Sequence, residues 1–173
     1  MHRGDIYDDP VEAALKASFP GSKIIGSGSE FDPEAGVLSA DLEFSLAPLN
    51  EDDDGHDAAD LVLDLLEAAG APRGSFASLE GGERVDFGQM FGIGVHLNNI
   101  DLRDEIYERY DVHDFLDKIY AALGSEGHMQ SYWESGDETS IFIYGLSEEK
   151  MRELIAPVLA TEPLAERCRV TQL

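Results

Sequence analysis

The histidines of this chain are the side chains best suited to metal binding, and their spacing does not build a site. There are five, at positions 2, 56, 96, 113 and 128. No two stand at the i, i+4 spacing at which one face of a helix presents two ligands to zinc. Thiolate ligands are equally scarce, because Cys168 is the only cysteine. We therefore predict no metal site.

Acid–base catalysis is the other chemistry open to these histidines. His96 falls on the glycine-rich face of an extended segment, and His113 falls near the start of a helix. If the two halves of the chain formed a cleft, either imidazole would be able to approach Glu134 or Asp101 as an acid–base pair. Histidines in such places are more often surface or core-edge residues, so we expect no catalytic residue and no enzyme. An enzyme that uses His96 or His128 with a nearby carboxylate is the least favoured alternative.

The loop 50–55 is rich in carboxylates, which are the side chains that bind calcium. With its glycine at the sixth position of an EF-hand loop, the twelfth position, which needs a bidentate glutamate, holds Leu61. We therefore predict no calcium site. The loop either is a solvated acidic segment before a helix, where negative charge is favourable, or binds a partner protein through Asp52, Asp53 and Asp54.

The glycines at 92 and 94 begin a dinucleotide-binding fingerprint without completing it. Leu97 stands where the third glycine belongs, and the segment lies inside a predicted strand instead of between a strand and a helix. We predict no bound cofactor.

Aromatic residues concentrate in a predicted hairpin near the C-terminus. Tyr132 and Trp133 lie on its first strand, and Phe142 and Tyr144 lie on its second. Such cross-strand aromatic groups usually serve packing, but tyrosine and tryptophan also dominate interface hot spots. Successive strand residues point to opposite faces, so at least one of Tyr132 and Trp133 is expected to point away from the helices. We predict that Tyr132, Trp133 and Tyr144 contact a partner.

The charge of the chain is its most unusual property. Its 36 acidic residues against 12 basic ones give a net charge of −24. Binding of nucleic acid through phosphates needs clustered lysine and arginine, so we expect no such binding. Three interpretations remain open: a solvated surface that maintains solubility, an acidic face that steers a basic protein partner, or adaptation to a high-salt cytoplasm.

The location of the protein is inferred from features that the sequence lacks. No apolar run approaches the roughly 20 residues of a membrane span, and the segment 1–5 does not open a signal peptide. A single cysteine excludes an intramolecular disulfide framework. We expect a cytoplasmic protein that does not bind membranes.

The stretch 85–97 predicts a long central strand. Six of its seven odd positions are apolar, whereas glycine takes three of the six even positions. Strict alternation indicates a strand with one buried face, and glycine within a strand marks a bend or a close approach of other atoms. We expect a bend near Gly92 or Gly94.

The order of predicted elements repeats along the chain. From Asp9 it is helix, strand, hairpin turn, strand, helix and short strand, and the same six steps recur from Asp111. The fold class is therefore α+β, with two related halves, 1–82 and 83–173, in which helices pack on antiparallel sheet. The second half reads βαββαβ, the ferredoxin-like order, whereas the first lacks a convincing opening strand. We expect the halves to form one compact unit, and Pro157 to bend or end the last helix.

These features favour a non-enzymatic acidic module that binds another protein. A concrete version is an immunity or antitoxin-type inhibitor of a basic partner protein. The alternative is a ligand-binding or regulatory ferredoxin-like module that works as a homodimer. That alternative would place a pocket or twofold interface on the face that carries Gly88, Gly92 and Gly94.

Overall fold

The chain divides into two compact units, each with its own core. The computed structural model describes residues 8–32, 36–48, 56–79, 82 and 84–173. The first unit is Met1–Gln89 and the second is Met90–Leu173. The boundary predicted at 82/83 falls between two strands of the first unit that pair with each other.

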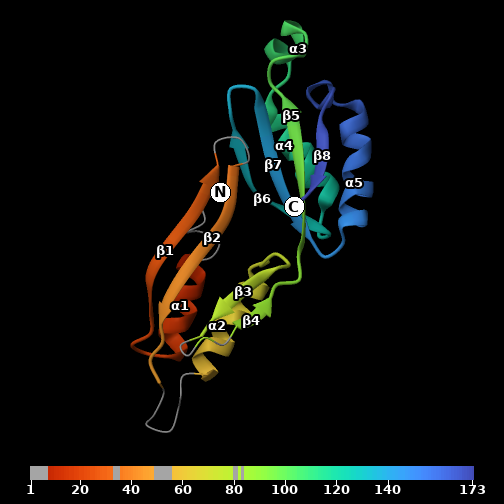
Figure 1. The fold of residues 1–173 in the computed structure, drawn as a ribbon. Coiled ribbons are helices and arrows are strands. Elements are labelled where there is room, and N and C mark those ends of the chain that lie inside the picture. Colours follow the sequence, from red (N-terminus) through yellow and green to blue (C-terminus); the bar gives the residue numbers. More distant parts are fainter. Residues whose placement is uncertain (1–7, 33–35, 49–55, 80–81, 83) are drawn as a thin grey trace. The chain divides into compact units, whose positions relative to one another are not determined.

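The second unit is a ferredoxin-like fold, as predicted. Its elements are β5 (Phe91–Asn98), α3 (Asp104–Arg109), α4 (Val112–Leu123), β6 (Gly127–Glu134), β7 (Glu138–Gly145), α5 (Glu148–Thr161), a 3₁₀ turn (Pro163–Ala165) and β8 (Arg169–Gln172). The strands form one four-stranded sheet in the order β6-β7-β5-β8, and every pair is antiparallel (Figure 1). The first strand after the unit begins is therefore central, between β7 and β8.

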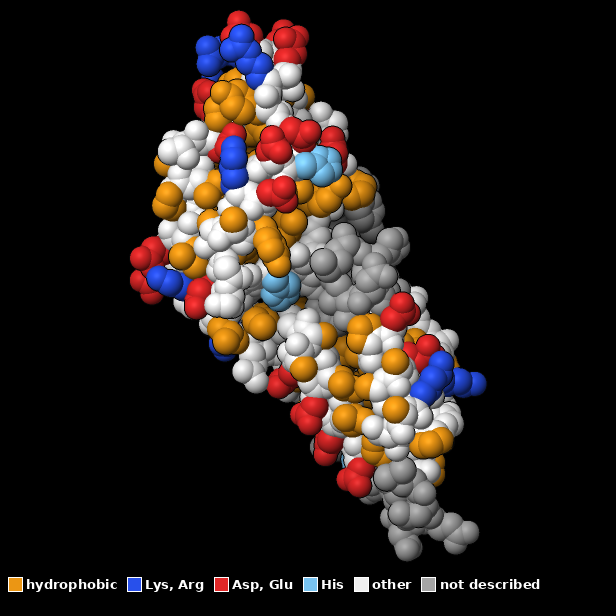
Figure 2. All heavy atoms as spheres, turned by 180° about the vertical axis from the view of Figure 1, so that it is seen from behind, with side chains coloured by type: hydrophobic (Ala, Val, Ile, Leu, Met, Phe, Trp, Pro, Cys, Tyr) orange, Lys and Arg blue, Asp and Glu red, His pale blue; other side chains and the backbone are white. Residues whose placement is uncertain are grey.

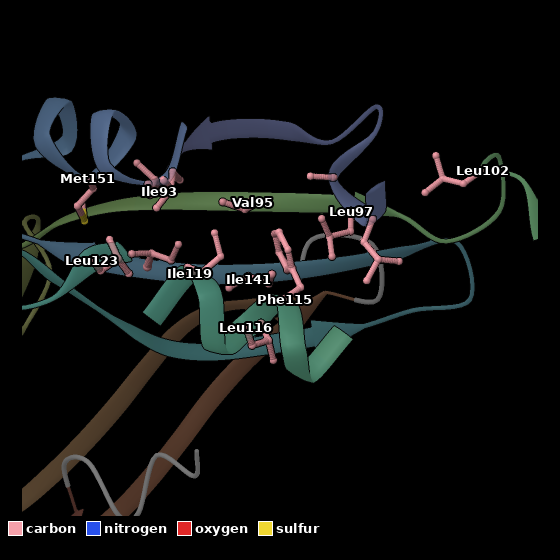
Figure 3. Close-up of a cluster of buried hydrophobic side chains, with 14 of the residues drawn as sticks. Ile93, Val95, Leu97, Leu102, Phe115, Leu116, Ile119, Leu123, Ile141 and Met151 are labelled. Atoms are coloured by element: carbon pink, nitrogen blue, oxygen red, sulfur yellow. The ribbon is translucent and has the colours of Figure 1, made fainter. Parts of the chain in front are cut away.

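The core of the second unit lies between this sheet and the helices α4 and α5. Ile93 and Val95 of β5 are fully buried against Phe115 of α4 and Met151 of α5, as Figure 3 shows. Burying each large apolar side chain contributes about 1.5–3 kcal/mol. Alternation in β5 thus sends its odd-numbered residues to the helices, and its even-numbered residues to the open face of the sheet.

The first unit is also α+β but has a smaller sheet. Its elements are α1 (Asp9–Ser18), β1 (Lys23–Asp32), β2 (Gly36–Ser45), α2 (His56–Ala68), β3 (Ser75–Ser78) and β4 (Arg84–Phe87). Among the described residues, β1 pairs with β2 and β3 pairs with β4, each as a two-stranded antiparallel sheet. Its core cluster consists of Leu15, Phe19, Ala58 and Val62. Half-buried side chains pack around it from β2, from the residue Leu46 just after β2, and from α2.

The two units share an order of elements, which confirms the predicted relation between the halves. The series α1-β1-β2-α2-β3 of the first unit corresponds to α4-β6-β7-α5-β8 of the second. The second unit has β5 ahead of this series. Residues 1–7, at which the sequence left the opening strand in doubt, lie outside the described part of the chain.

The prediction of one continuous strand over 85–97 is wrong. The stretch contains two strands, β4 in the first unit and β5 in the second, with Gly88 between them at φ +89°. A Cβ atom on Gly88 would lie 2.0 Å from the carbonyl oxygen of Pro72, so only glycine fits this close approach. The chain therefore breaks at Gly88, and not at Gly92 or Gly94.

Side-chain caps begin two of the helices in the second unit. The carboxylate of Asp111 accepts a hydrogen bond from the backbone N–H of His113 at 2.7 Å and caps α4. Ser147 caps α5 in the same way. Of the two expectations for Pro157, a bend or an end of the helix, the second is wrong, because α5 continues to Thr161 with the proline inside it. The residues after Pro157 pack on the core through Val158 and Leu159, which holds the last turn in place.

None of the described helices is both long and apolar enough to cross a membrane.

Candidate functional site

The acidic loop that the sequence proposed as a contact site lies outside the described residues. Asp52, Asp53 and Asp54 all fall within the gap between Pro48 and His56. Their role in partner binding stays a prediction.

The three predicted aromatic contacts lie on different faces of the second unit. The register pairs Tyr132 with Ile141 on the helix side of the sheet, and Trp133 with Ser140 on the open face. Tyr132 is 43% exposed because β6 is an edge strand. Tyr144 lies on the open face, and both Trp133 and Tyr144 are half-buried. The structure therefore brings Trp133 and Tyr144 to one face and keeps Tyr132 apart from them.

The glycine face of β5 is covered by neighbouring side chains. A Cβ atom on Gly92 would lie 2.8 Å from Cε1 of Tyr144, and one on Gly94 would lie 2.7 Å from Nε2 of His96. The two glycines thus make room for an aromatic ring and an imidazole that lie across the open face. A ligand or a second copy at this position would meet Tyr144 and His96, and the homodimer alternative stays a prediction.

His96 is the centre of a polar network that joins three strands of the sheet. Its Nδ1 lies 3.0 Å from Oε1 of Glu138 and 2.9 Å from Oγ of Ser140. Its Nε2 lies 2.8 Å from Oγ1 of Thr171. Arg169 on β8 forms an ion pair with the same glutamate. The histidine partner is thus Glu138, and not the Glu134 or Asp101 that the sequence suggested.

The electrostatics of this network favour a charged glutamate. Burial alone would raise the pKa of Glu138, but hydrogen bonds from Arg169 and Ser140 and the nearby His96 together hold that pKa below its ordinary value. The side chain of His96 is only 12% exposed, and both ring nitrogens have partners. Each contact ties β5 to a neighbouring strand, so the network stabilises the sheet. The enzyme hypothesis requires access to one of these nitrogens and stays untested.

Other candidate chemical groups do not assemble into a site in the described part of the chain. No three histidine, cysteine, aspartate or glutamate side chains there are grouped to hold a metal ion. Burial lowers the pKa of His128 and raises that of the Cys168 thiol, so both favour their neutral forms. A surface hollow is lined by Phe91, Leu146 and the first turn of α5, without any histidine.

A second candidate surface, which the sequence did not single out, is the outward face of α4. Tyr120 is 63% exposed and Tyr110, just before the helix, is 41% exposed. His113, Asp117 and Tyr120 follow one another at i, i+4 and i+7, so they form one stripe on the helix. All three are exposed, and we call this stripe with Tyr110 the α4 face. The signal was present in the sequence as tyrosine at polar positions of an amphipathic helix.

The surroundings of the α4 face are acidic. Asp111 and Asp114 are also exposed in the first turn of the helix. The pKa of Asp111 is lowered, because the backbone N–H and the ring of His113 both hydrogen bond to its carboxylate. Lys118 is engaged by Glu162 at 2.5 Å, which raises the pKa of the lysine. Figure 2 shows that carboxylates outnumber basic side chains over the visible surface.

Comparisons with known proteins assign the chain to no family. No family and no curated protein matches its sequence. Among solved structures it is similar to the crystal structure of the first two RRM domains of a yeast poly(U) binding protein, with 14% identity and a TM-score of 0.27. The similarity covers 95% of this chain and 90% of that one. No activity or partner is transferred to the chain from this similarity.

The prediction of no nucleic-acid binding through phosphate contacts needs correction. It rested on the net charge of −24, yet the structure found in the comparison belongs to a protein named for binding poly(U). Single-stranded nucleic acid is recognised on sheets through bases that stack on aromatic side chains, as well as through phosphates. Clustered lysine and arginine are therefore not the only means of binding nucleic acid, and we withdraw the exclusion.

Proposed function

We propose that this chain is a non-enzymatic acidic module that binds a basic protein through the α4 face. An immunity or antitoxin-type inhibitor of a basic partner, acting in the cytoplasm, is the specific form of this proposal. The observation that supports it is the exposure of Tyr110 and Tyr120, 41% and 63%, among the carboxylates of α4. Tyr132, Trp133 and Tyr144 are proposed as further contacts.

The α4 face has the composition of an interface hot spot with an acidic surround. Tyrosine buries a large area on binding and loses little conformational freedom, which is why it is enriched in hot spots. His113 and Tyr120 are separated along the helix by about 10 Å, at 1.5 Å per residue. The flanking aspartates would attract a cationic surface over a distance set by the ionic strength. Tyrosine contacts would therefore give affinity, and carboxylates would give speed of association.

The experiment is a pull-down with the full chain from lysate of the native organism, at low and high salt. We expect retention of a basic protein that salt weakens. The Tyr120→Ala variant should lower its affinity about 25-fold or more, since hot-spot truncations cost about 2 kcal/mol or more. Asp117→Asn should slow association.

The matched control for the charge change is Glu105→Gln, on the exposed surface of α3. It removes the same charge as Asp117→Asn but lies off the α4 face. Equal binding by wild type and Tyr120→Ala, or equal effects of Asp117→Asn and Glu105→Gln, would count against the proposed face.

A further inference from the structure

Within the described ranges, β2 of the first unit pairs with one strand, whereas its counterpart β7 in the second unit pairs with two. β7 pairs with β6 on one side and with β5 on the other. β2, which follows β1 as β7 follows β6, pairs in the described part of the chain with β1 alone. Among the described residues, no strand lies beside β2 in the position that β5 holds in the second unit.

Burial in the two units reflects this difference. Ile141 and Ile143 of β7 point to the helices and are both 0% exposed. Leu42 and Phe44, the helix-facing residues of β2, are only half-buried, and Leu38 farther along the strand is 56% exposed. The core cluster of the second unit contains 15 buried residues, against four in the first. The first unit thus has apolar surface that a further strand would cover.

The helix α2, next to this core, has apolar side chains that are only half-buried. α2 carries four leucines, Leu61, Leu63, Leu65 and Leu66, and each remains half-buried. Of these, Leu61 and Leu66 pack against the core cluster of the unit. A strand beside β2 would bring a new row of side chains toward these helices, as β5 does in the second unit.

The charge of the first unit specifies the chemistry of such a strand. The unit has 20 acidic and five basic residues over positions 1–89. Asp41 and Glu43 of β2 are exposed on the face away from the helices. A strand that pairs here would present one row of side chains to the apolar side and the other row to these carboxylates. Alternating apolar and basic residues satisfy both.

We propose that the outer edge of β2 binds an extended segment of the basic partner protein by β-strand addition. In this mode main-chain hydrogen bonds supply affinity, and alternate side chains supply specificity. A second copy of this chain is a poorer occupant, because each copy carries a net charge of −24 and like charges repel. The inference rests on the proposed function for the identity of the partner, but it concerns a different unit and a different surface.

The test uses a synthetic peptide that alternates lysine and valine over 8 residues, the length of β5. We expect it to bind the full chain and to slow hydrogen exchange at alternate backbone amides of β2. N-methylation of either the valines or the lysines removes the donors on one side of the peptide strand. One of these two peptides should lose about tenfold or more in affinity, and the other should bind nearly unchanged, because a single edge uses alternate amides.

Protein variants separate the edge from general electrostatics. Asp41→Lys and Glu43→Lys should each weaken the peptide more than Glu105→Lys, which changes the net charge equally in the second unit. Absence of binding, equal affinity of the two N-methylated peptides, or protection outside β2 would overturn the proposal. The Tyr120→Ala variant should bind the peptide as wild type does. A failure of the proposed α4 face is therefore distinguishable from a failure of the proposed edge of β2.

Discussion

Substitution of Gly88 tests whether the end of the first unit requires a residue without a Cβ atom. It lies between β4 and β5 at φ +89°, and a Cβ atom there would lie 2.0 Å from the carbonyl oxygen and 2.8 Å from the carbonyl carbon of Pro72. Both of these atoms belong to the backbone, so the clash cannot be relieved by rotating a side chain. Gly88→Ala should therefore displace the segment from the turn at Pro72.

Two effects of this substitution lower the free energy of unfolding: the strain of a positive φ at a residue with a Cβ atom, and the loss of hydrogen bonds. A positive φ costs a residue with a Cβ about 1–2 kcal/mol. Displacement would also break the hydrogen bonds from Gly88 N to Glu67 at 3.1 Å and from Gln89 N to the carbonyl of Ala71 at 3.2 Å. Each contributes about 1 kcal/mol net. We expect Gly88→Ala to lower the free energy of unfolding of the first unit by about 3–4 kcal/mol.

Gly74 is the matched control for this experiment. Its φ is +87°, and a Cβ atom there would meet nothing within 4 Å. Gly74→Ala should therefore cost only the strain of the positive φ, about 1–2 kcal/mol. The difference between the two variants isolates the clash at Pro72.

The assay follows urea unfolding with two probes. Trp133 is the single tryptophan and lies in the second unit, so its fluorescence follows that unit. Far-ultraviolet circular dichroism follows both units. We expect Gly88→Ala to shift the dichroism transition of the first unit and to leave the Trp133 transition in place. Equal costs for Gly88→Ala and Gly74→Ala would refute the steric reasoning.

Two further predictions concern the second unit, and Trp133 fluorescence in urea measures both. Asp111→Ala removes the cap of α4 and should lower the free energy of unfolding by about 0.5–2 kcal/mol. Asp114→Ala, in the same turn, should lower it by less than about half a kcal/mol. Equal losses in the two variants would contradict the capping role. The pKa of Glu138 lies below its ordinary value of 4.5 in the folded state, so its stabilisation is complete above the unfolded pKa and is lost as the pH falls through the folded one. Glu138→Gln should flatten this acid loss of stability, and a profile as steep as that of wild type would exclude the carboxylate as its source.

The sequence predicted the second unit well because its signals are local and agree with one another. Alternation indicated the strand that became β5, and the order of elements predicted from Asp111 corresponds to α4, β6, β7, α5 and β8. The prediction of one continuous strand over 85–97 was wrong for a physical reason. Phe87 ends β4 and Phe91 begins β5, so the apolar residues keep the same parity across the break. Periodicity records which face of a strand is apolar, and not which sheet it joins.

The candidate surfaces were harder to predict because they depend on register and exposure. Glu138 meets His96 because β7 pairs with β5 over Asn98↔Glu138 and His96↔Ser140, a relation that no short-range pattern contains. Strand alternation did predict that Tyr132 and Trp133 point to opposite faces. The α4 face was not predicted, because the periodicity of an amphipathic helix marks its apolar positions and Tyr120 lies on the polar side of α4.

The two units share one order of elements, but their strands form sheets of different size. The series helix, strand, strand, helix, strand is set locally, by turns, caps and periodicity, and both units contain it. A single four-stranded sheet needs one more strand, which must pair with the hairpin on one side and with the final strand on the other. In the second unit β5 supplies it, so β7 and β8 are joined through β5. In the first unit β3 pairs instead with β4, and β2 keeps an open edge in the part of the chain that the structure describes. A two-stranded sheet is marginal by itself, so the first unit gains most from an added strand, and this is why we place the strand-binding edge there.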